Sequence, residues 1–109
     1  MIKAIIVEDE KMSRETLRRM LEKYCPSVEI VAEADGYRKG LEVIRKFEPD
    51  VVFLDIQMPD GSGFRMLEEL DDIDFEIIFT TAFDQFAIKA IKYSALDYLL
   101  KPVIPLNLS

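Results

Sequence analysis

The chain has 109 residues, of which 50% are hydrophobic and 32% are charged, and this size and balance fit one globular domain with a single core. Its 21 acidic and 14 basic side chains give a net charge of −7, which opposes binding to nucleic-acid phosphates, so we expect no direct nucleic-acid contact. Histidine is absent and Cys25 is the one cysteine, which excludes Ser-His-Asp and Cys-His catalysis, Cys/His zinc sites and disulfide frameworks.

The apolar runs of the sequence are only a few residues long, and Met1 leads directly into a strand-like segment. We therefore expect no transmembrane helix, no signal peptide and no membrane contact, and a cytoplasmic protein. Cys25 stands directly before Pro26, where a half-buried residue at a helix end is a better interpretation than a redox group.

Five short apolar runs predict buried strands. Most of these runs are continuous, as expected when helices cover both faces of a parallel sheet. The second run begins Val28-Glu29-Ile30, and this alternation predicts an edge strand. The expected strands are residues 4–7, 28–32, 51–54, 77–79 and 98–100.

Between these strands, apolar residues at helical spacing predict amphipathic helices. The first helix should end near Cys25, because Pro26 disfavours helical geometry in the residue before it. Asp35 is expected to cap the second helix, the third follows the turn at 59–63, and Asp84 is expected to cap the fourth. The apolar stripes are Leu17, Met20, Leu21 and Tyr24; Tyr37, Gly40, Leu41 and Ile44; Phe64, Leu67 and Leu70; and Ala87, Ala90 and Ile91.

Strands and helices alternate along the chain, and right-handed crossovers then predict an α/β, doubly wound, five-stranded parallel sheet with helices on both faces. We expect residues 1–109 to form one domain. After the last strand, Pro105 starts a helix with room for barely one turn, so a truncated fifth helix is expected. The sheet would then be partly uncovered near the first helix, which favours a homodimer or a larger assembly.

Polar residues stand at the ends of four predicted strands, where open α/β sheets bind their ligands. If the first and third strands are neighbours, these residues converge on one crevice. They are Glu8, Asp9 and Glu10 after the first strand, Asp55 after the third, Thr81 after the fourth and Lys101 after the fifth.

This set of residues predicts phosphoryl transfer with a divalent metal. Clustered carboxylates need a counter-charge, and an all-oxygen site with room for water suits Mg²⁺. Asp55 follows four apolar residues and is placed to act as a nucleophile toward phosphorus, for which an ionised carboxylate needs no general base. Asp9, Lys101 and Thr81 would supply a metal ligand, an ammonium group and a hydroxyl group.

Each of these motifs alone has a simpler structural interpretation. The acidic run 8–10 can place negative charge at a helix N-terminus, and Thr81 can be an ordinary strand residue. Tyr98 can be a core aromatic residue, and Lys101 with Pro102 can end a strand. Their occurrence together at successive strand ends favours a functional site.

Four motifs follow one another along the chain: IIVEDE at 5–10, DVVFLDIQMP at 50–59 with DGSG after it, FTTA at 79–82 and DYLLKP at 97–102. With these motifs, residues 5–103 resemble the receiver domain of two-component response regulators. The run from 79 to 102 further resembles receivers of the LytTR class, in which a DNA-binding domain follows in the same polypeptide. No such output domain is expected within the 109 residues.

The resemblance implies a flavodoxin-like sheet of order 2-1-3-4-5 and a phosphoryl group transferred from a sensor histidine kinase to Asp55. It implies self-catalysed phosphotransfer and autodephosphorylation rather than a separate enzymatic activity, with a switch of the fourth helix and fifth strand that controls a transcriptional output. Glu8 stands where the family often has Asp, so direct and water-mediated metal contact are both open. The implied site residues are Asp55 as phosphoacceptor; Glu8, Asp9, Asp55 and the main-chain carbonyl of Gln57 around Mg²⁺; Lys101 on the phosphoryl group; and Thr81 and Tyr98 as the switch pair.

Two alternative functions remain at this point. A phosphohydrolase of the haloacid dehalogenase type uses an Asp nucleophile, but it needs a second carboxylate two positions later, where this chain has Gln57. A degenerate receiver would act only as a protein-interaction module, and the intact set of acidic, hydroxyl and lysine residues argues against it.

Overall fold

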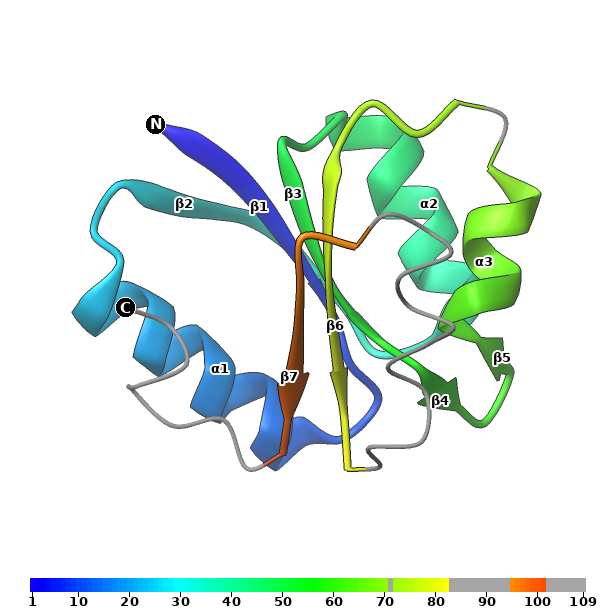
Figure 1. Ribbon diagram of the computed structural model, residues 1–109, viewed down its shortest axis with the longest axis horizontal. Helices are drawn as coiled ribbons and strands as arrows, with labels where there is room; N and C mark the ends of the chain where they lie inside the picture. The colour runs from blue at the N-terminus through cyan, green and yellow to red at the C-terminus, as the bar shows by residue number, and fades with distance from the viewer. Residues whose placement is uncertain (71, 83–94, 102–109) are drawn as a thin grey trace.

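A parallel β-sheet runs through the middle of the molecule with helices on both sides (Figure 1). This computed structural model describes residues 1–70, 72–82 and 95–101, the side chains of Tyr98 and Leu100 excepted. The described strands are β1 (Ile2–Val7), β2 (Val28–Ala34), β3 (Val51–Asp55), β4 (Gln57–Met58), β5 (Gly61–Ser62), β6 (Glu76–Thr81) and β7 (Asp97–Leu100), and the described helices are α1 (Lys11–Tyr24), α2 (Tyr37–Phe47) and α3 (Gly63–Glu69).

The main sheet has five parallel strands in the order β2-β1-β3-β6-β7. This is the expected order 2-1-3-4-5, because β4 and β5 form a separate antiparallel hairpin between β3 and α3. All five predicted strands are present, each slightly longer than its apolar run, and β2 lies at the edge as its alternation predicted. None of the described helices has the length and apolar character needed to cross a membrane.

Both faces of the sheet are apolar, which explains the continuous apolar runs in the central strands. Successive side chains of a strand point to opposite faces, so each strand contributes to two cores. On the side of α2 and α3 the buried apolar residues of the main sheet are Ile5, Val7, Ala34, Val52, Leu54, Ile77 and Phe79, and on the side of α1 they are Ala4, Ile6, Val51, Phe53 and Leu99.

The side of α1 carries an apolar pocket of about 510 Å³ between α1 and β7. The sequence predicted an uncovered part of the sheet near the first helix, and this prediction depends on residues 102–109, which lie outside the described part of the chain. The predicted fifth helix from Pro105 lies outside the described residues, as do the predicted fourth helix and its cap Asp84.

Helix α1 ends where the sequence predicted. Its last residue is Tyr24, and Cys25 is the C-cap residue, whose N–H donates to the Leu21 carbonyl at 2.9 Å. Cys25 is half-buried, as expected for its position before Pro26.

The start of α2 differs from the prediction. Gly36, and not Asp35, is the N-cap residue, and it has no side chain that could accept a hydrogen bond. Asp60, from the turn between β4 and β5, accepts the backbone N–H groups of Tyr37 at 2.8 Å and Arg38 at 3.2 Å. The prediction for Asp35 is wrong because the capping carboxylate comes from Asp60, which follows Tyr37 by 23 positions.

The segment after β3 was predicted only as a turn, and it forms the β4–β5 hairpin. Gly61 has φ of +157° in this hairpin, and a Cβ there would collide with the Tyr37 ring. Ser62 caps α3 by accepting the Phe64 N–H at 3.1 Å. A Cβ on Gly63 would collide with the Asp55 carbonyl oxygen, so this glycine allows α3 to start directly against the end of β3.

Candidate functional site

The polar residues predicted at four strand ends lie at one edge of the sheet. Strands β1, β3, β6 and β7 are adjacent, and their register pairs Val7 with Leu54, Asp55 with Thr80, and Thr81 with Leu100. Glu8 and Lys101 each follow directly after their strand. The convergence expected from the sequence is therefore present in the fold.

Three carboxylates meet at this edge, from Glu8, Asp9 and Asp55, which we call the carboxylate cluster. One oxygen atom from each lies within 4.8 Å of the others. Glu8 and Asp55 are each 2% exposed, and Asp9 is half-buried. The cluster is therefore closed on the side of the sheet and open to solvent at Asp9.

Backbone groups hold two of these carboxylates in place. The Glu10 N–H donates to Oε2 of Glu8 at 3.1 Å, and the Gln57 N–H donates to Oδ1 of Asp55 at 3.3 Å. The Glu8 N–H in turn donates to the Ala34 carbonyl at the end of β2. The loop after β1 is thus fixed by hydrogen bonds within itself and to the neighbouring strand.

Lys101 supplies positive charge to the carboxylate cluster. Its Nζ lies 2.6 Å from Oε1 of Glu8, 3.6 Å from Oδ1 of Asp55 and 3.5 Å from Oε1 of Glu10. The Lys101 N–H donates to the Thr81 carbonyl at 2.7 Å, which fixes the start of the side chain. Burial lowers the pKa of Lys101, but the surrounding carboxylates outweigh burial and raise it overall, so the ammonium stays charged.

One ammonium does not balance this many acids. Burial, helped by the nearby acidic groups of Asp9 and Glu8, raises the pKa of Asp55 from 3.8 to about 8, although Lys101 acts in the opposite direction. Without a further cation, Asp55 therefore favours the protonated form at neutral pH. A raised pKa of this kind marks a group whose ionised form needs a ligand or a metal.

The chemistry of the donors fits Mg²⁺. All three cluster residues offer carboxylate oxygens, the ligands that this hard cation prefers, and the half-buried Asp9 leaves room for the waters that it keeps. A pocket of about 120 Å³ opens next to the cluster on the side of α1, with space for a small group. Its lining residues are Glu8, Met12, Ser13, Thr16, Leu17, Thr80 and Lys101.

The remaining predicted site residues lie around the cluster in different ways. The Gln57 side chain is exposed, while its backbone amide contacts Asp55. Thr81 is 1% exposed at the end of β6, beside the strand that carries Lys101. Tyr98 lies on β7 in register with Phe79, but its side chain, on which the predicted switch role depends, falls outside the described part of the chain.

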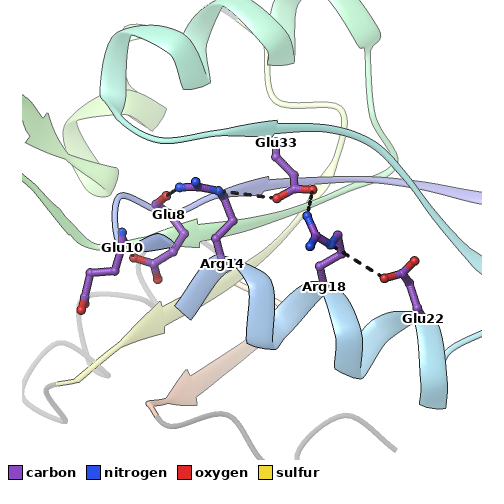
Figure 2. A network of polar contacts seen from close by, with 6 residues as sticks. All are labelled: Glu8, Glu10, Arg14, Arg18, Glu22 and Glu33. Carbon is purple, nitrogen blue, oxygen red and sulfur yellow. Dashed lines mark hydrogen bonds and ion pairs between the residues drawn. The ribbon is translucent and has the colours of Figure 1, made fainter. Parts of the chain in front are cut away.

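Sequence reasoning missed the contribution of Arg14. This residue, on the first turns of α1, donates from Nη1 to the Glu8 carbonyl oxygen at 2.8 Å (Figure 2). The sequence shows only a basic residue within an amphipathic helix, and it carries no signal for a bond to the backbone of the preceding loop.

Comparison with known proteins agrees with this geometry. The family model described as response regulator receiver domain matches residues 4–109. The chain belongs to this family. The receiver assignment made from the four motifs is therefore confirmed, and the carboxylate cluster is consistent with the Mg²⁺ site of a receiver domain.

Curated relatives of this receiver domain include regulators from distant bacteria. It is 48% identical over 104 residues to the transcriptional regulatory protein BtsR of Escherichia coli, and 43% identical over 104 residues to the sensory transduction protein LytT of Bacillus anthracis. Each alignment covers 94% of this chain, but 43% of BtsR and 42% of LytT. The chain thus spans less than half the length of these relatives.

Solved receiver structures have the same fold. The response regulatory domain of mrkE from Klebsiella pneumoniae matches with a TM-score of 0.88 and 29% identity, covering 98% of this chain and 88% of that one. The receiver domain of AraT from Geobacillus stearothermophilus matches with a TM-score of 0.85 and 32% identity, covering 98% and 86%.

Proposed function

We propose that this receiver domain accepts a phosphoryl group on Asp55 from the phosphohistidine of a sensor histidine kinase, with Mg²⁺ as its cofactor. The main support is the carboxylate cluster, in which three acidic groups lie within 4.8 Å of one another beside the ammonium group of Lys101. A nucleophile, a cation site and a fixed positive charge are the parts that phosphoryl transfer needs.

The transfer consists of one bond exchange. The P–N bond of the phosphohistidine breaks, a P–O bond forms to a carboxylate oxygen of Asp55, and the released histidine nitrogen takes up a proton from solvent. Asp55 must be ionised to attack, so the cation that lowers its raised pKa also prepares the nucleophile. When bound, Mg²⁺ would screen the approach of the two anions and neutralise charge that develops on the phosphoryl oxygens.

Each of the other site residues has a proposed role. Glu8, Asp9, Asp55 and the main-chain carbonyl of Gln57 would hold the metal. Lys101 would contact a phosphoryl oxygen, for which its place next to Asp55 is suitable.

Phosphorylation adds roughly −1.5 to −2 charges at Asp55, which changes the balance of the whole site. We expect the hydroxyl of Thr81 to bond a phosphoryl oxygen and Tyr98 to move inward in response. This would alter the surface of β7 and of residues 83–94, by favouring one of two existing conformations, typically by about 1–3 kcal/mol.

The biological output follows from the relatives rather than from the site. BtsR is named a transcriptional regulatory protein and LytT a sensory transduction protein. We therefore propose that the receiver domain belongs to a LytTR-class regulator and controls a DNA-binding output, through a homodimer or a larger assembly. It would catalyse its own phosphorylation and autodephosphorylation and have no separate substrate.

The test is to incubate the 109-residue chain with acetyl phosphate and Mg²⁺ and to measure its intact mass. The wild type is expected to gain one phosphoryl group, and Asp55→Asn is expected to gain none. Asp35→Asn is the matched control, because it removes an exposed carboxylate next to the same edge of the sheet and should leave the adduct unchanged.

Different results would favour the alternatives. A wild type that forms no adduct with Mg²⁺ at saturation points to a receiver that works only as an interaction module. Many phosphates released per chain per minute from a small monoester would support the hydrolase, but Gln57 is an exposed amide at the position where that reaction needs an acid. An adduct of equal size in Asp55→Asn would contradict the assignment of Asp55.

A further inference from the structure

We infer that Arg14 is a positioning residue for the metal site, which acts by fixing the peptide unit between Glu8 and Asp9. This inference rests on the proposed function, because it concerns the Mg²⁺ that the carboxylate cluster would hold. It goes beyond the proposed function by assigning a role to Arg14, a residue on α1 whose side chain contacts the Glu8 carbonyl oxygen and the Glu33 carboxylate.

Arg14 contacts the backbone at the point where the site is built. Its Nη1 donates to the Glu8 carbonyl oxygen at 2.8 Å. That carbonyl belongs to the planar peptide unit that also contains the Asp9 nitrogen and ends at the Asp9 Cα. Holding the oxygen therefore fixes the rotation of the plane and the direction of the N–Cα bond of Asp9, the bond from which the Asp9 side chain is oriented.

Asp9 is the cluster residue that most needs such support. Glu8 and Asp55 are buried, and each accepts a backbone N–H within hydrogen-bond distance. Asp9 is half-buried and lies in the loop between β1 and α1. Because fewer atoms pack around a half-buried side chain, the backbone before Asp9 contributes more to its placement than the backbone does for the two buried carboxylates.

Arg14 is itself held in place by the network drawn in Figure 2, which we call the arginine–glutamate network and which consists of Arg14, Arg18, Glu22 and Glu33. Nε of Arg14 lies 3.5 Å from Oε1 of Glu33, on β2. The other oxygen of Glu33 accepts from Nη1 of Arg18 at 3.1 Å, so one acid on the strand holds two arginines on the helix. The contacts thus run from Glu33 on β2 through Arg14 to the loop between β1 and α1, which carries Glu8 and Asp9.

The guanidinium group suits this double contact. Its nitrogens point in fixed directions in one plane, so Nε can face Glu33 while Nη1 reaches the Glu8 carbonyl. The side chain is 19% exposed, which limits competition from water. A lysine would keep the charge but could not make both contacts with one rigid group.

A purely electrostatic role for Arg14 predicts the opposite result from a positioning role. Removing a positive charge near a divalent cation should strengthen Mg²⁺ binding, because a repulsion is lost. Loss of positioning should weaken it, since partners that orient metal ligands are typically worth tenfold or more in affinity. The sign of the change therefore separates the two roles.

The experiment measures Mg²⁺ binding by following the amide chemical shifts of Asp9 and Asp55 during a Mg²⁺ titration of the full 109-residue chain. We expect the dissociation constant to rise about tenfold in both Arg14→Gln and Arg14→Lys. The matched control is Arg19→Gln, which removes one positive charge from an exposed position of the same helix and should change binding less than about twofold. In metal-free Arg14→Gln the Asp9 amide resonance should already be displaced, because it shares the peptide plane.

Phosphorylation by acetyl phosphate gives a second measurement. The Mg²⁺ concentration for half-maximal rate should rise about tenfold in Arg14→Gln, while the rate at saturating Mg²⁺ should stay within about threefold of the wild type. A general loss of stability would lower the fraction of folded protein. It would not change the Mg²⁺ concentration at which the folded protein reaches half its maximal rate.

Unchanged or tighter Mg²⁺ binding in folded Arg14→Gln would overturn the inference, and so would wild-type affinity in Arg14→Lys. If Arg14→Gln does not fold, Glu33→Gln tests the same point, since it frees Arg14 while keeping both arginines. It should weaken binding about threefold, and wild-type affinity in it would count against the inference. A wild type that binds no Mg²⁺ would instead contradict the proposed function itself.

Discussion

Two clusters of charged side chains border α1, and they differ in charge balance and burial. In the carboxylate cluster three acids share the ammonium group of Lys101, and two of these acids are almost fully buried. In the arginine–glutamate network two arginines face two glutamates, and exposure of the side chains rises from 19% at Arg14 to 66% at Glu22 (Figure 2).

This difference suits the carboxylate cluster to binding a cation and the arginine–glutamate network to holding the backbone. Burial, together with the neighbouring acidic groups, raises the pKa of Asp55 and favours the entry of a cation. In the partly exposed arginine–glutamate network the positive and negative charges balance, so the network needs no bound ion. Arg14 of this network can therefore hold the Glu8 carbonyl. The two clusters meet at Glu8, whose carboxylate belongs to one and whose carbonyl is held by the other.

The largest expected effect comes from removing the positive charge of the carboxylate cluster. Lys101→Met should slow adduct formation with acetyl phosphate at saturating Mg²⁺ by roughly a hundredfold, because a fixed charge next to the transferred group is lost. Lys39→Met is the control, since that exposed lysine pairs with Glu42 on α2. The rate of mass increase measures adduct formation in both variants. A wild-type rate in Lys101→Met would contradict the role of its ammonium group in the carboxylate cluster.

A second test uses the charge excess directly. The folded pKa of Asp55, about 8, lies above the unfolded value near 4, so the metal-free folded state binds more protons in this range and its stability should fall as pH rises through it. Asp55→Asn should therefore be more stable than the wild type by about 1–2 kcal/mol at pH 8, or on the order of 5–10 °C in Tm.

The advantage of Asp55→Asn should shrink as the pH falls toward about 4, where the unfolded carboxyl is also protonated. Thermal unfolding from pH 4 to pH 8 without Mg²⁺ measures this trend, with Asp74→Asn as an exposed control. Equal stability of Asp55→Asn and wild type at pH 8 would mean that the cluster is not short of positive charge.

Asp60 gives the opposite pH dependence, because its carboxylate accepts hydrogen bonds from backbone N–H groups. The N–H groups of Tyr37 and Arg38 lower its pKa, so its contribution is present above the usual carboxyl range and is lost as pH falls through the folded pKa. Asp60→Ala should cost about 1 kcal/mol at pH 7, as for other helix caps. Urea unfolding at pH 7 and pH 3 measures this cost, and a cost that persists at pH 3 would contradict the capping role.

The smallest effects are expected within the arginine–glutamate network. Glu22→Gln should change Tm by less than about a degree, because the 3.8 Å pair with Arg18 is exposed on one helix. Glu33→Gln should lower Tm by a few degrees, since that acid contacts both arginines. Thermal unfolding at low and high salt measures both, and equal effects of the two variants would show that Glu33 is not the centre of the network.

The sequence by itself determined the order of the described elements and which polar residues meet at one edge of the sheet. Continuous apolar runs such as Val51-Val52-Phe53-Leu54 indicate strands that are covered on both faces of the sheet. The segments between them have apolar residues at helical spacing, which predicts the helices that cover these faces. These local patterns are enough to predict a doubly wound sheet. The residues at the strand ends could be predicted for the same reason, because parallel strands present their carboxyl ends at one edge.

Only the tertiary structure decided the contacts between different elements of the fold. Asp60 caps α2 in place of Asp35, Gly63 lies against the Asp55 carbonyl, and Arg14 reaches the Glu8 carbonyl. Each of these depends on how loops and helices lie against one another once the sheet has formed. The sequence carries no local periodicity for such contacts, because a contact between two elements depends on the distance between its atoms in space and not on the spacing of the residues along the chain.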